Sequence, residues 1–184
     1  MNDEDEDIEK YKVSFIGPKT GGKTCIITRF HNNHFTTQVG STIGAAFITH
    51  VVQISSMKIA LHIWDTAGEE RYRCMIPMYF RGSAALVVVF DISHRPNFEQ
   101  AKEWFKTILN EENDAFDLYF VGNKVDLPRA VSTEEAIDFA KTVNATYVET
   151  SAKTGEKIND LFLMIAEKII QREDHSLTIP SHFP

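Results

Sequence analysis

The segment Gly17–Thr24 has the residue types and the spacing of a loop that binds phosphate groups. It reads G-x-x-x-x-G-K-T and lies between an apolar β-branched run and a segment with helical periodicity, as expected for the loop that holds a nucleoside triphosphate. Backbone N–H groups and the positive end of the helix would surround the phosphates. Lys23 would add a positive charge at the β- and γ-phosphates, and the Thr24 hydroxyl could ligate Mg²⁺. The alternative is a glycine-rich turn that precedes a helix by chance.

Polar motifs follow three further apolar runs of the chain. They are Asp65–Gly68 after residues 59–64, Asn123–Asp126 after residues 118–121, and Ser151–Lys153 after residues 146–150. Because ligands bind at the carboxyl ends of the strands in an α/β sheet, we expect these motifs to lie beside the phosphate loop. Each motif alone could be an ordinary polar turn at the end of a strand. The four together favour one nucleotide site.

The chemistry of these motifs indicates a guanine nucleotide with a metal ion. Asp65 provides a carboxylate behind Mg²⁺, and Gly68 lacks the Cβ that would crowd a γ-phosphate. Asp126 could accept hydrogen bonds from N1 and N2 of guanine, a donor pair that adenine lacks. The segment Ser151–Lys153 could offer a backbone N–H to O6 of guanine. The sequence therefore predicts GTP rather than ATP.

The composition fits one globular domain without a surface for nucleic acid. The chain has 184 residues, of which 43% are hydrophobic and 24% charged, as is ordinary for a soluble domain. Six acidic residues among the first nine supply −6 of the net charge of −7, which leaves about −1 for the remainder. We expect residues 1–10 to form a solvated, disordered acidic tail, with an acidic docking tail as the alternative.

Cysteine content and hydropathy predict a cytoplasmic protein. Cys25 and Cys74 are the two cysteines, and they make no disulfide framework or metal-ligand spacing. Cys25 follows the phosphate loop directly, where a small packed residue is expected. No apolar run approaches the roughly 18 residues that a membrane span needs, and the acidic N-terminus is unlike a signal peptide.

Alternating apolar and amphipathic segments predict an α/β fold with a mostly parallel sheet. Strands are expected at residues 11–16, 47–54, 58–64, 84–90, 118–121 and 146–150, and helices after residue 24, at 97–110, after 132 and at 157–171. The short connection after residue 54 predicts an antiparallel pair. Ser132 and Glu135 predict a capping box. We expect a single domain over residues 11–171, followed by a C-terminal tail over residues 172–184.

The four motifs resemble those of the Ras-like small GTPases over residues 11–171. Within that group Ser41–Phe47, Trp64 and Arg71-Tyr72 resemble the Rab family, and the TIGAAF string and Pro77-Met78-Tyr79 are most similar to its early-endosomal branch. The resemblance implies a P-loop G domain, an α/β fold in which helices cover both faces of a six-stranded, mostly parallel sheet with one antiparallel strand. It implies a GTPase that binds GTP or GDP with Mg²⁺ and acts as a monomeric switch in vesicle trafficking. Its partners would be effector proteins, a guanine-nucleotide exchange factor and a GTPase-activating protein.

The resemblance also implies roles for individual residues. Thr42 would ligate Mg²⁺ and bond the γ-phosphate through its backbone, and Phe35 would stack edge-to-face on guanine. Residues 36–47 and 67–80 would be switch segments, ordered by GTP and loosened by GDP. The implied groups are catalytic Lys23, Thr42, Gly68 and Glu69; metal-binding Thr24, Thr42 and Asp65; effector-binding Phe47, Trp64 and Tyr79; and nucleotide-binding Lys19, Thr20, Gly21, Gly22, Lys23, Thr24, Cys25, Phe35, Thr42, Gly68, Asn123, Lys124, Asp126, Ser151, Ala152 and Lys153. For the three effector aromatics, ordinary core or sheet packing is the alternative.

Two departures from the family concern hydrolysis. Glu69 stands where the family usually has a Gln that orients the attacking water, and an ionised carboxylate cannot donate a hydrogen bond. At about 5 Å and an effective dielectric near 20, its repulsion from a γ-phosphate charge is roughly 3 kcal/mol. Lys19 and Thr20 replace small residues and could obstruct the in-line geometry, although Lys19 could also offset the charge of Glu69. We therefore expect slow hydrolysis; a nucleotide-loaded module without turnover is the alternative, and a small P-loop kinase is a third.

A third departure concerns the membrane. The family ends in a tail with cysteines for prenylation, and no Cys follows Gln171. As given, the chain therefore has no lipid anchor of its own. A lipidated C-terminus or a second domain outside this chain would place the protein at the endosomal membrane surface.

Overall fold

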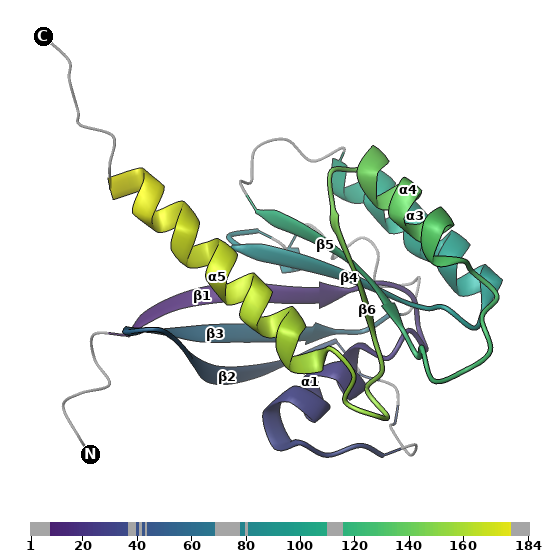
Figure 1. Cartoon of the computed structure of the whole chain (residues 1–184), viewed down its shortest axis with the longest axis horizontal. Coiled ribbons are helices and arrows are strands. Elements are labelled where there is room, and N and C mark those ends of the chain that lie inside the picture. The colour runs from purple at the N-terminus through teal and green to yellow at the C-terminus, as the bar shows by residue number, and fades with distance from the viewer. Residues whose placement is uncertain are drawn as a thin grey trace, which may run out of the picture.

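The computed structural model describes residues 8–36, 40, 42, 44–68, 78–79, 81–109 and 116–177. Within these residues, six strands form one sheet in the order β2-β3-β1-β4-β5-β6 (Figure 1). The strands are β1 (Glu9–Ile16), β2 (Ala45–Ile54), β3 (Met57–Thr66), β4 (Ala85–Asp91), β5 (Asp117–Asn123) and β6 (Thr146–Thr150); the helices are α1 (Lys23–Asn32), α3 (Arg95–Leu109), α4 (Thr133–Thr142) and α5 (Ile158–Leu177).

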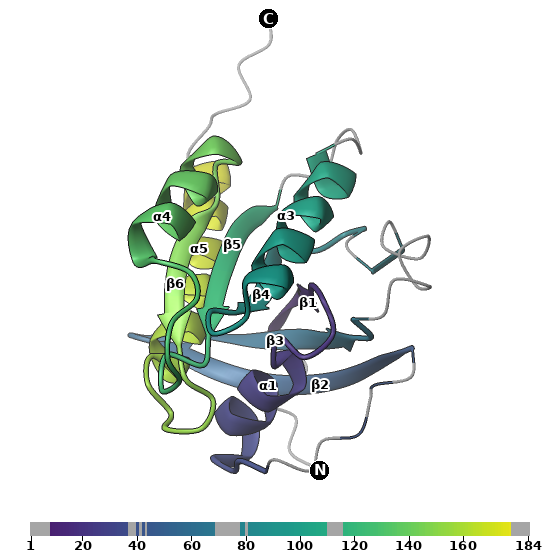
Figure 2. The same ribbon diagram turned by 90° about the vertical axis from the view of Figure 1, so that its right-hand side faces the viewer.

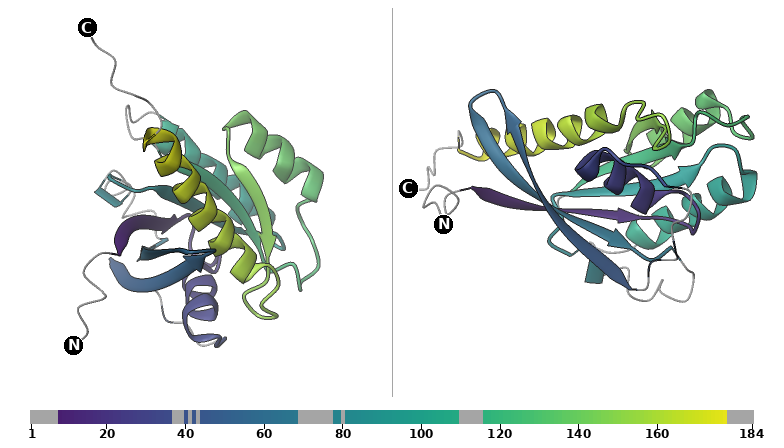
Figure 3. Two further views of the ribbon diagram at one scale, coloured as in Figure 1. Left: turned by 60° about the vertical axis from the view of Figure 1, so that its left-hand side comes forward. Right: turned by 90° about the horizontal axis from the view of Figure 1, so that it is seen from below.

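The pairing of the strands confirms the predicted fold class. β1, β3, β4, β5 and β6 run parallel, and β2 pairs with β3 in the antiparallel sense. Ile54 pairs with Met57 across the turn, so two residues close the hairpin, and Ser55 adopts the left-handed φ of 54° that such turns favour. The hairpin forms one edge of the sheet, as the view from below in Figure 3 shows.

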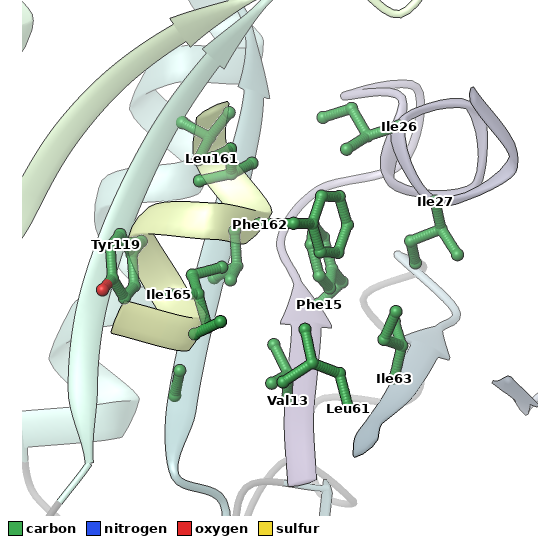
Figure 4. Packing of buried hydrophobic residues seen from close by; sticks show 14 of the residues in the cluster. Val13, Phe15, Ile26, Ile27, Leu61, Ile63, Tyr119, Leu161, Phe162 and Ile165 are labelled. Carbon is green, nitrogen blue, oxygen red and sulfur yellow. The ribbon is translucent and has the colours of Figure 1, made fainter. Parts of the chain in front are cut away.

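Helices cover both faces of the sheet, and each face has its own core. On one face α1 and α5 pack on β1 and β3, where Phe162 of α5 stacks on Phe15 with ring centroids 5.4 Å apart (Figure 4). Phe162 also stacks on Phe30 of α1, with ring centroids 3.7 Å apart. On the other face α3 and α4 enclose a second cluster, in which the ring centroids of Phe105 and Phe120 are 5.3 Å apart. β4 is buried along its whole length, because both faces of a central strand are covered.

Several elements extend beyond their predicted bounds, β1 and α5 among them. β1 begins at Glu9 rather than at residue 11, because residues 9–10 continue the register with β3. α5 runs to Leu177 rather than ending at residue 171. Arg172 secures this extension, since its Nη1 lies 3.6 Å from Asp117 Oδ2 and 3.4 Å from the carbonyl oxygen of Ala84. Among the described residues no helix has the length and apolar character that crossing a bilayer requires.

The capping box predicted for α4 is half formed. Ser132 Oγ accepts the backbone N–H of Glu135 at 3.2 Å, as the pattern predicts. The Glu135 carboxylate instead makes a two-pronged contact with Arg95, at 2.5 and 2.8 Å. The ion pair with Arg95 of α3 therefore takes the place of the bond from Glu135 back to the Ser132 N–H. This ion pair joins the first turns of α3 and α4.

Candidate functional site

The four predicted motifs meet at the carboxyl ends of the parallel strands, the side that faces the viewer in Figure 2. Two adjoining cavities of about 210 and 330 Å³ lie there. Gly22, Cys25 and Lys124 line both cavities. All predicted nucleotide contacts except Gly21 and Ser151 line one cavity or the other. The fold therefore brings four segments that are distant in the sequence together into one site.

Close packing against β4 and β5 fixes the course of the phosphate loop. A Cβ on Gly17 or Gly21 would lie 2.5 or 2.7 Å from the carbonyl oxygen of Val89. Gly22 has φ 94°, and a Cβ there would lie 2.3 Å from Nδ2 of Asn123. Glycine is required at these positions because a neighbouring backbone or buried amide occupies the space that any side chain would fill.

Lys23 extends under the loop and is 6% exposed. Its Nζ donates hydrogen bonds of 3.0 Å to the carbonyl oxygens of both Gly17 and Pro18. Burial lowers its pKa to about 8, and the charge of Asp65 partly opposes that shift. A buried ammonium group at the floor of the smaller cavity, which Lys23 lines, is suited to bind an anion such as a phosphate.

Oxygen donors suited to a hard cation gather beside Lys23. Thr24 Oγ1 donates to Asp65 Oδ2 at 2.6 Å and lies 3.1 Å from Thr42 Oγ1. Asp65 is 4% exposed, and its Oδ1 is buried without a hydrogen-bond partner among the described residues. Burial raises its pKa, although the Thr24 hydroxyl and the Lys23 charge oppose the shift. The donor set fits Mg²⁺, which binds through few carboxylates and completes its shell with water and substrate phosphates.

Asn123 was predicted to bind the nucleotide, and in the structure its side chain joins neighbouring loops. Its Nδ2 donates to the carbonyl oxygen of Gly21 at 3.0 Å. Its Oδ1 accepts from Thr150 Oγ1 and from the Ala152 N–H, both at 3.2 Å. Asn123 lines the larger cavity, and its side chain joins the phosphate loop to the end of β6 and the loop that follows.

Asp126 and Phe35 are the two residues whose predicted partner is the guanine base. Both line the larger cavity. Asp126 Oδ1 accepts from Ser151 Oγ at 2.6 Å, and its Oδ2 lies 3.9 Å from Lys153 Nζ. Ser151 therefore acts on the carboxylate rather than lining the cavity. Phe35 is partly buried, and the Arg29 guanidinium lies 5.9 Å from the centre of its ring.

The sequence did not reveal two residues that hold these loops in place. Arg29 of α1 donates to the carbonyl oxygens of Ala152 at 2.8 Å and Lys153 at 2.6 Å. Asp91 pairs with Lys124 at 2.6 Å and accepts from both the N–H and the hydroxyl of Ser93. Burial opposes ionisation of Asp91, but these hydrogen bonds outweigh it and hold its pKa below the ordinary value. The only signal for Asp91 was its place at the end of an apolar run.

The aromatic residues predicted to bind effectors differ in exposure. Phe47 is 50% exposed, and its ring centroid lies 5.5 Å from that of the half-buried Trp64. Tyr79 is 5% exposed, so its predicted exposure is wrong and the alternative of core packing holds for it. Ser14 Oγ donates to the Tyr79 carbonyl oxygen at 2.7 Å, which holds this short turn against β1.

Several predicted features lie wholly or partly outside the described residues. Glu69 and Cys74 are among them, as are most of the second switch segment and part of the first. Gly68 is described, and a Cβ there would lie 2.5 Å from Lys23 Nζ and 2.6 Å from the Lys19 backbone nitrogen. Gly68 therefore touches the phosphate loop, in a position that only glycine fits.

Fold and site together define a small GTPase, and residues 12–171 match the Ras family. The chain belongs to that family. Among its relatives are two proteins of Dictyostelium discoideum. Ras-related protein Rab-5A is 39% identical over 164 residues, which are 88% of this chain and 82% of the relative. Putative ras-related protein Rab-5B is 42% identical over 163 residues, 88% of this chain and 76% of the relative. The predicted resemblance to the Rab family and its early-endosomal branch is confirmed, and this is a Rab-like GTPase of the kind that switches vesicle trafficking.

Proposed function

We propose that the two joined cavities bind GTP or GDP together with Mg²⁺, and that the protein hydrolyses GTP slowly. The carrying observation is the Asp65 carboxyl, whose Oδ1 is buried without a partner in the described part of the chain while its Oδ2 accepts the Thr24 hydroxyl. A divalent cation beside Thr24 would supply the missing partner. The smaller cavity would take the phosphates, and Asp126 in the larger one would take the guanine.

The residues of the smaller cavity would stabilise the attack of water on the γ-phosphate. Bound Mg²⁺ would neutralise charge on the β- and γ-phosphates. Lys23 would offset the same charge, and backbone N–H groups of the loop would donate to phosphate oxygens. Thr42 and Gly68 line the same cavity, where their backbones would contact the γ-phosphate.

Slow turnover is proposed from the chemistry of Glu69. A carboxylate in place of the Gln that orients the attacking water repels the γ-phosphate, and when ionised it cannot donate a hydrogen bond. Lys19 lines the smaller cavity and would offset part of that repulsion. The alternative proposal is a nucleotide-loaded module that does not hydrolyse GTP.

The family supports effectors, exchange factors and GTPase-activating proteins as classes of partner. We propose that effectors dock beside the exposed Phe47 and the half-buried Trp64, which form an aromatic pair on β2 and β3. Association with endosomal membranes is proposed from the similarity to Rab-5A and Rab-5B.

Identification of the copurifying nucleotide and metal tests the binding proposal, and single-turnover hydrolysis of bound GTP tests the rate. We expect a guanine nucleotide with Mg²⁺, slow hydrolysis by the wild type, and faster hydrolysis by Glu69→Gln. Glu134→Gln, on the exposed face of α4, is the matched control and should hydrolyse GTP at the wild-type rate. Binding without hydrolysis in both wild type and Glu69→Gln would favour the module. Absence of any bound guanine nucleotide would refute the proposal.

A further inference from the structure

The side-chain amide of Asn97, in the first turn of α3, is buried directly behind the phosphate loop. Asn97 is 2% exposed. Its Nδ2 donates to the Lys19 carbonyl oxygen at 2.8 Å and lies 3.5 Å from Thr20 Oγ1. Its Oδ1 accepts the backbone N–H of Asp91 at 2.8 Å. One side chain therefore joins the phosphate loop to α3 and to the end of β4.

The partners of Asn97 determine the orientation of its amide. The Lys19 carbonyl oxygen can only accept, and the Asp91 N–H can only donate. Exchanging the amide oxygen and nitrogen would set oxygen against oxygen at the loop and N–H against N–H at β4. The donor end of Asn97 therefore faces the loop.

The loop that Asn97 contacts contains a residue in a strained conformation. Thr20 has φ 68°, in the left-handed region that β-branched residues rarely adopt. Glycine would adopt the same conformation without that steric cost. Thr20 is exposed, so burial of its side chain does not hold it there. Asn97 contacts the residue before Thr20 and the Thr20 hydroxyl itself.

We infer that Asn97 is a positioning residue for the nucleotide: it holds Lys19 and the strained Thr20 in place and so slows nucleotide release. Its hydrogen bond occupies the Lys19 carbonyl from behind, while both loop residues line the smaller cavity. The inference rests on the proposed binding of guanine nucleotides. It assigns to a helix outside the four motifs a part in retaining the ligand, exerted through the phosphate loop.

Release of fluorescent GDP from the Mg²⁺-loaded full chain tests the inference. Asn97→Ala should release GDP about three- to tenfold faster, the effect of losing the buried hydrogen bond to the phosphate loop. Asn97→Asp keeps an acceptor for the Asp91 N–H but cannot donate to Lys19, so it should also release faster. Gln100→Ala, an exposed amide on the same helix, is the control and should match the wild type. The thermal unfolding midpoint of each variant identifies any loss that reflects stability alone.

The deciding comparison repeats Asn97→Ala in a Thr20→Gly background. Because glycine adopts the loop conformation unaided, the acceleration should shrink to less than twofold there. An equal acceleration in both backgrounds would mean that Asn97 acts only through packing, and would overturn the inference. So would GDP release from Asn97→Asp at the wild-type rate. A wild-type chain that binds no guanine nucleotide overturns the proposed function as well, which separates the two failures.

Discussion

The side-chain nitrogen of Asn123 lies 3.0 Å from the carbonyl oxygen of Gly21, and this contact joins two loops 102 residues apart. Asn123 Oδ1 accepts from Thr150 and from the Ala152 N–H on the loop after β6. Asn123 is 1% exposed, so water cannot replace these partners. The phosphate loop and the two proposed base loops therefore depend on one amide for their relative positions.

Replacing Asn123 should loosen all three loops and weaken nucleotide binding. We expect Asn123→Ala to reduce GDP affinity about 10- to 2,000-fold, because it removes three hydrogen bonds worth roughly 0.5–1.5 kcal/mol each. Thr150→Val has nearly the same shape and removes a single one of them, so its effect should stay within about tenfold. Equilibrium titration with fluorescent GDP measures both. Equal affinity in wild type and Asn123→Ala would show that the loops hold their positions without this amide.

The fold and the motifs were predictable because their signals are local. The apolar run of β4 and the glycines at positions 17 and 22 each indicate their structure within a few neighbouring residues. The supports of the site carry no such signal. Asn97 meets the phosphate loop across 78 residues, and Arg29 meets the loop after β6 across 123. Each is an ordinary helical position until the chain has folded.

Packing also decided which aromatic side chains are exposed. Phe47 and Tyr79 are both aromatic residues beside a proposed switch, and nothing in their flanking residues separates them. Phe47 lies on the edge strand β2 and is 50% exposed, whereas Tyr79 is held against β1 through its carbonyl oxygen and is 5% exposed. The exposure of each side chain depends on the residues packed around it in the folded protein, and the local sequence does not reveal those residues.

Specificity for guanine should reside in Asp126. Ser151 Oγ donates to Asp126 Oδ1 at 2.6 Å, so an amide at this position should keep its oxygen toward Ser151 and turn its nitrogen to the base. Asp126→Asn should therefore favour xanthine nucleotides, whose O2 accepts a hydrogen bond where guanine donates. Competition between GTP and XTP measures the change, with Asp138→Asn on the exposed face of α4 as the control. If Asp126→Asn keeps the wild-type ratio of GTP to XTP affinity, Asp126 does not contact the base.

Acid should destabilise the contact between α1 and β2. His50 Nδ1 lies 3.2 Å from His31 Nδ1, and its ring packs 4.4 Å from that of Phe30. Burial, and then the charge of His31, lowers the pKa of His50 from its ordinary value of 6.5. As the pH falls, His50 therefore takes up its proton in the unfolded chain before it does so in the folded protein. The free energy of unfolding keeps its full value above pH 6.5, the unfolded pKa, and decreases as the pH falls through the lowered pKa of the folded state.

Urea unfolding at about pH 7.5 and about pH 5.5 measures this loss. His50→Gln should lose less stability than the wild type over this range. Replacement of the exposed His34 by Gln should leave the loss unchanged. A wild type and a His50→Gln variant with the same pH dependence would assign the loss to other groups.

The position of Gly68 predicts how the second switch segment responds to nucleotide. A Cβ at Gly68 would lie 2.5 Å from Lys23 Nζ and 2.6 Å from the Lys19 backbone nitrogen, so the segment can close on the phosphate loop only with glycine there. Amide hydrogen exchange in residues 36–47 and 67–80 should slow when a non-hydrolysable GTP analogue replaces GDP. In Gly68→Ala the two nucleotides should give the same exchange over residues 67–80, because the methyl group prevents closure. Exchange within β6 should be the same in every state and serves as the internal reference. If amide exchange in these two segments of the wild type is the same with GDP and with the analogue, the protein is a static module rather than a switch.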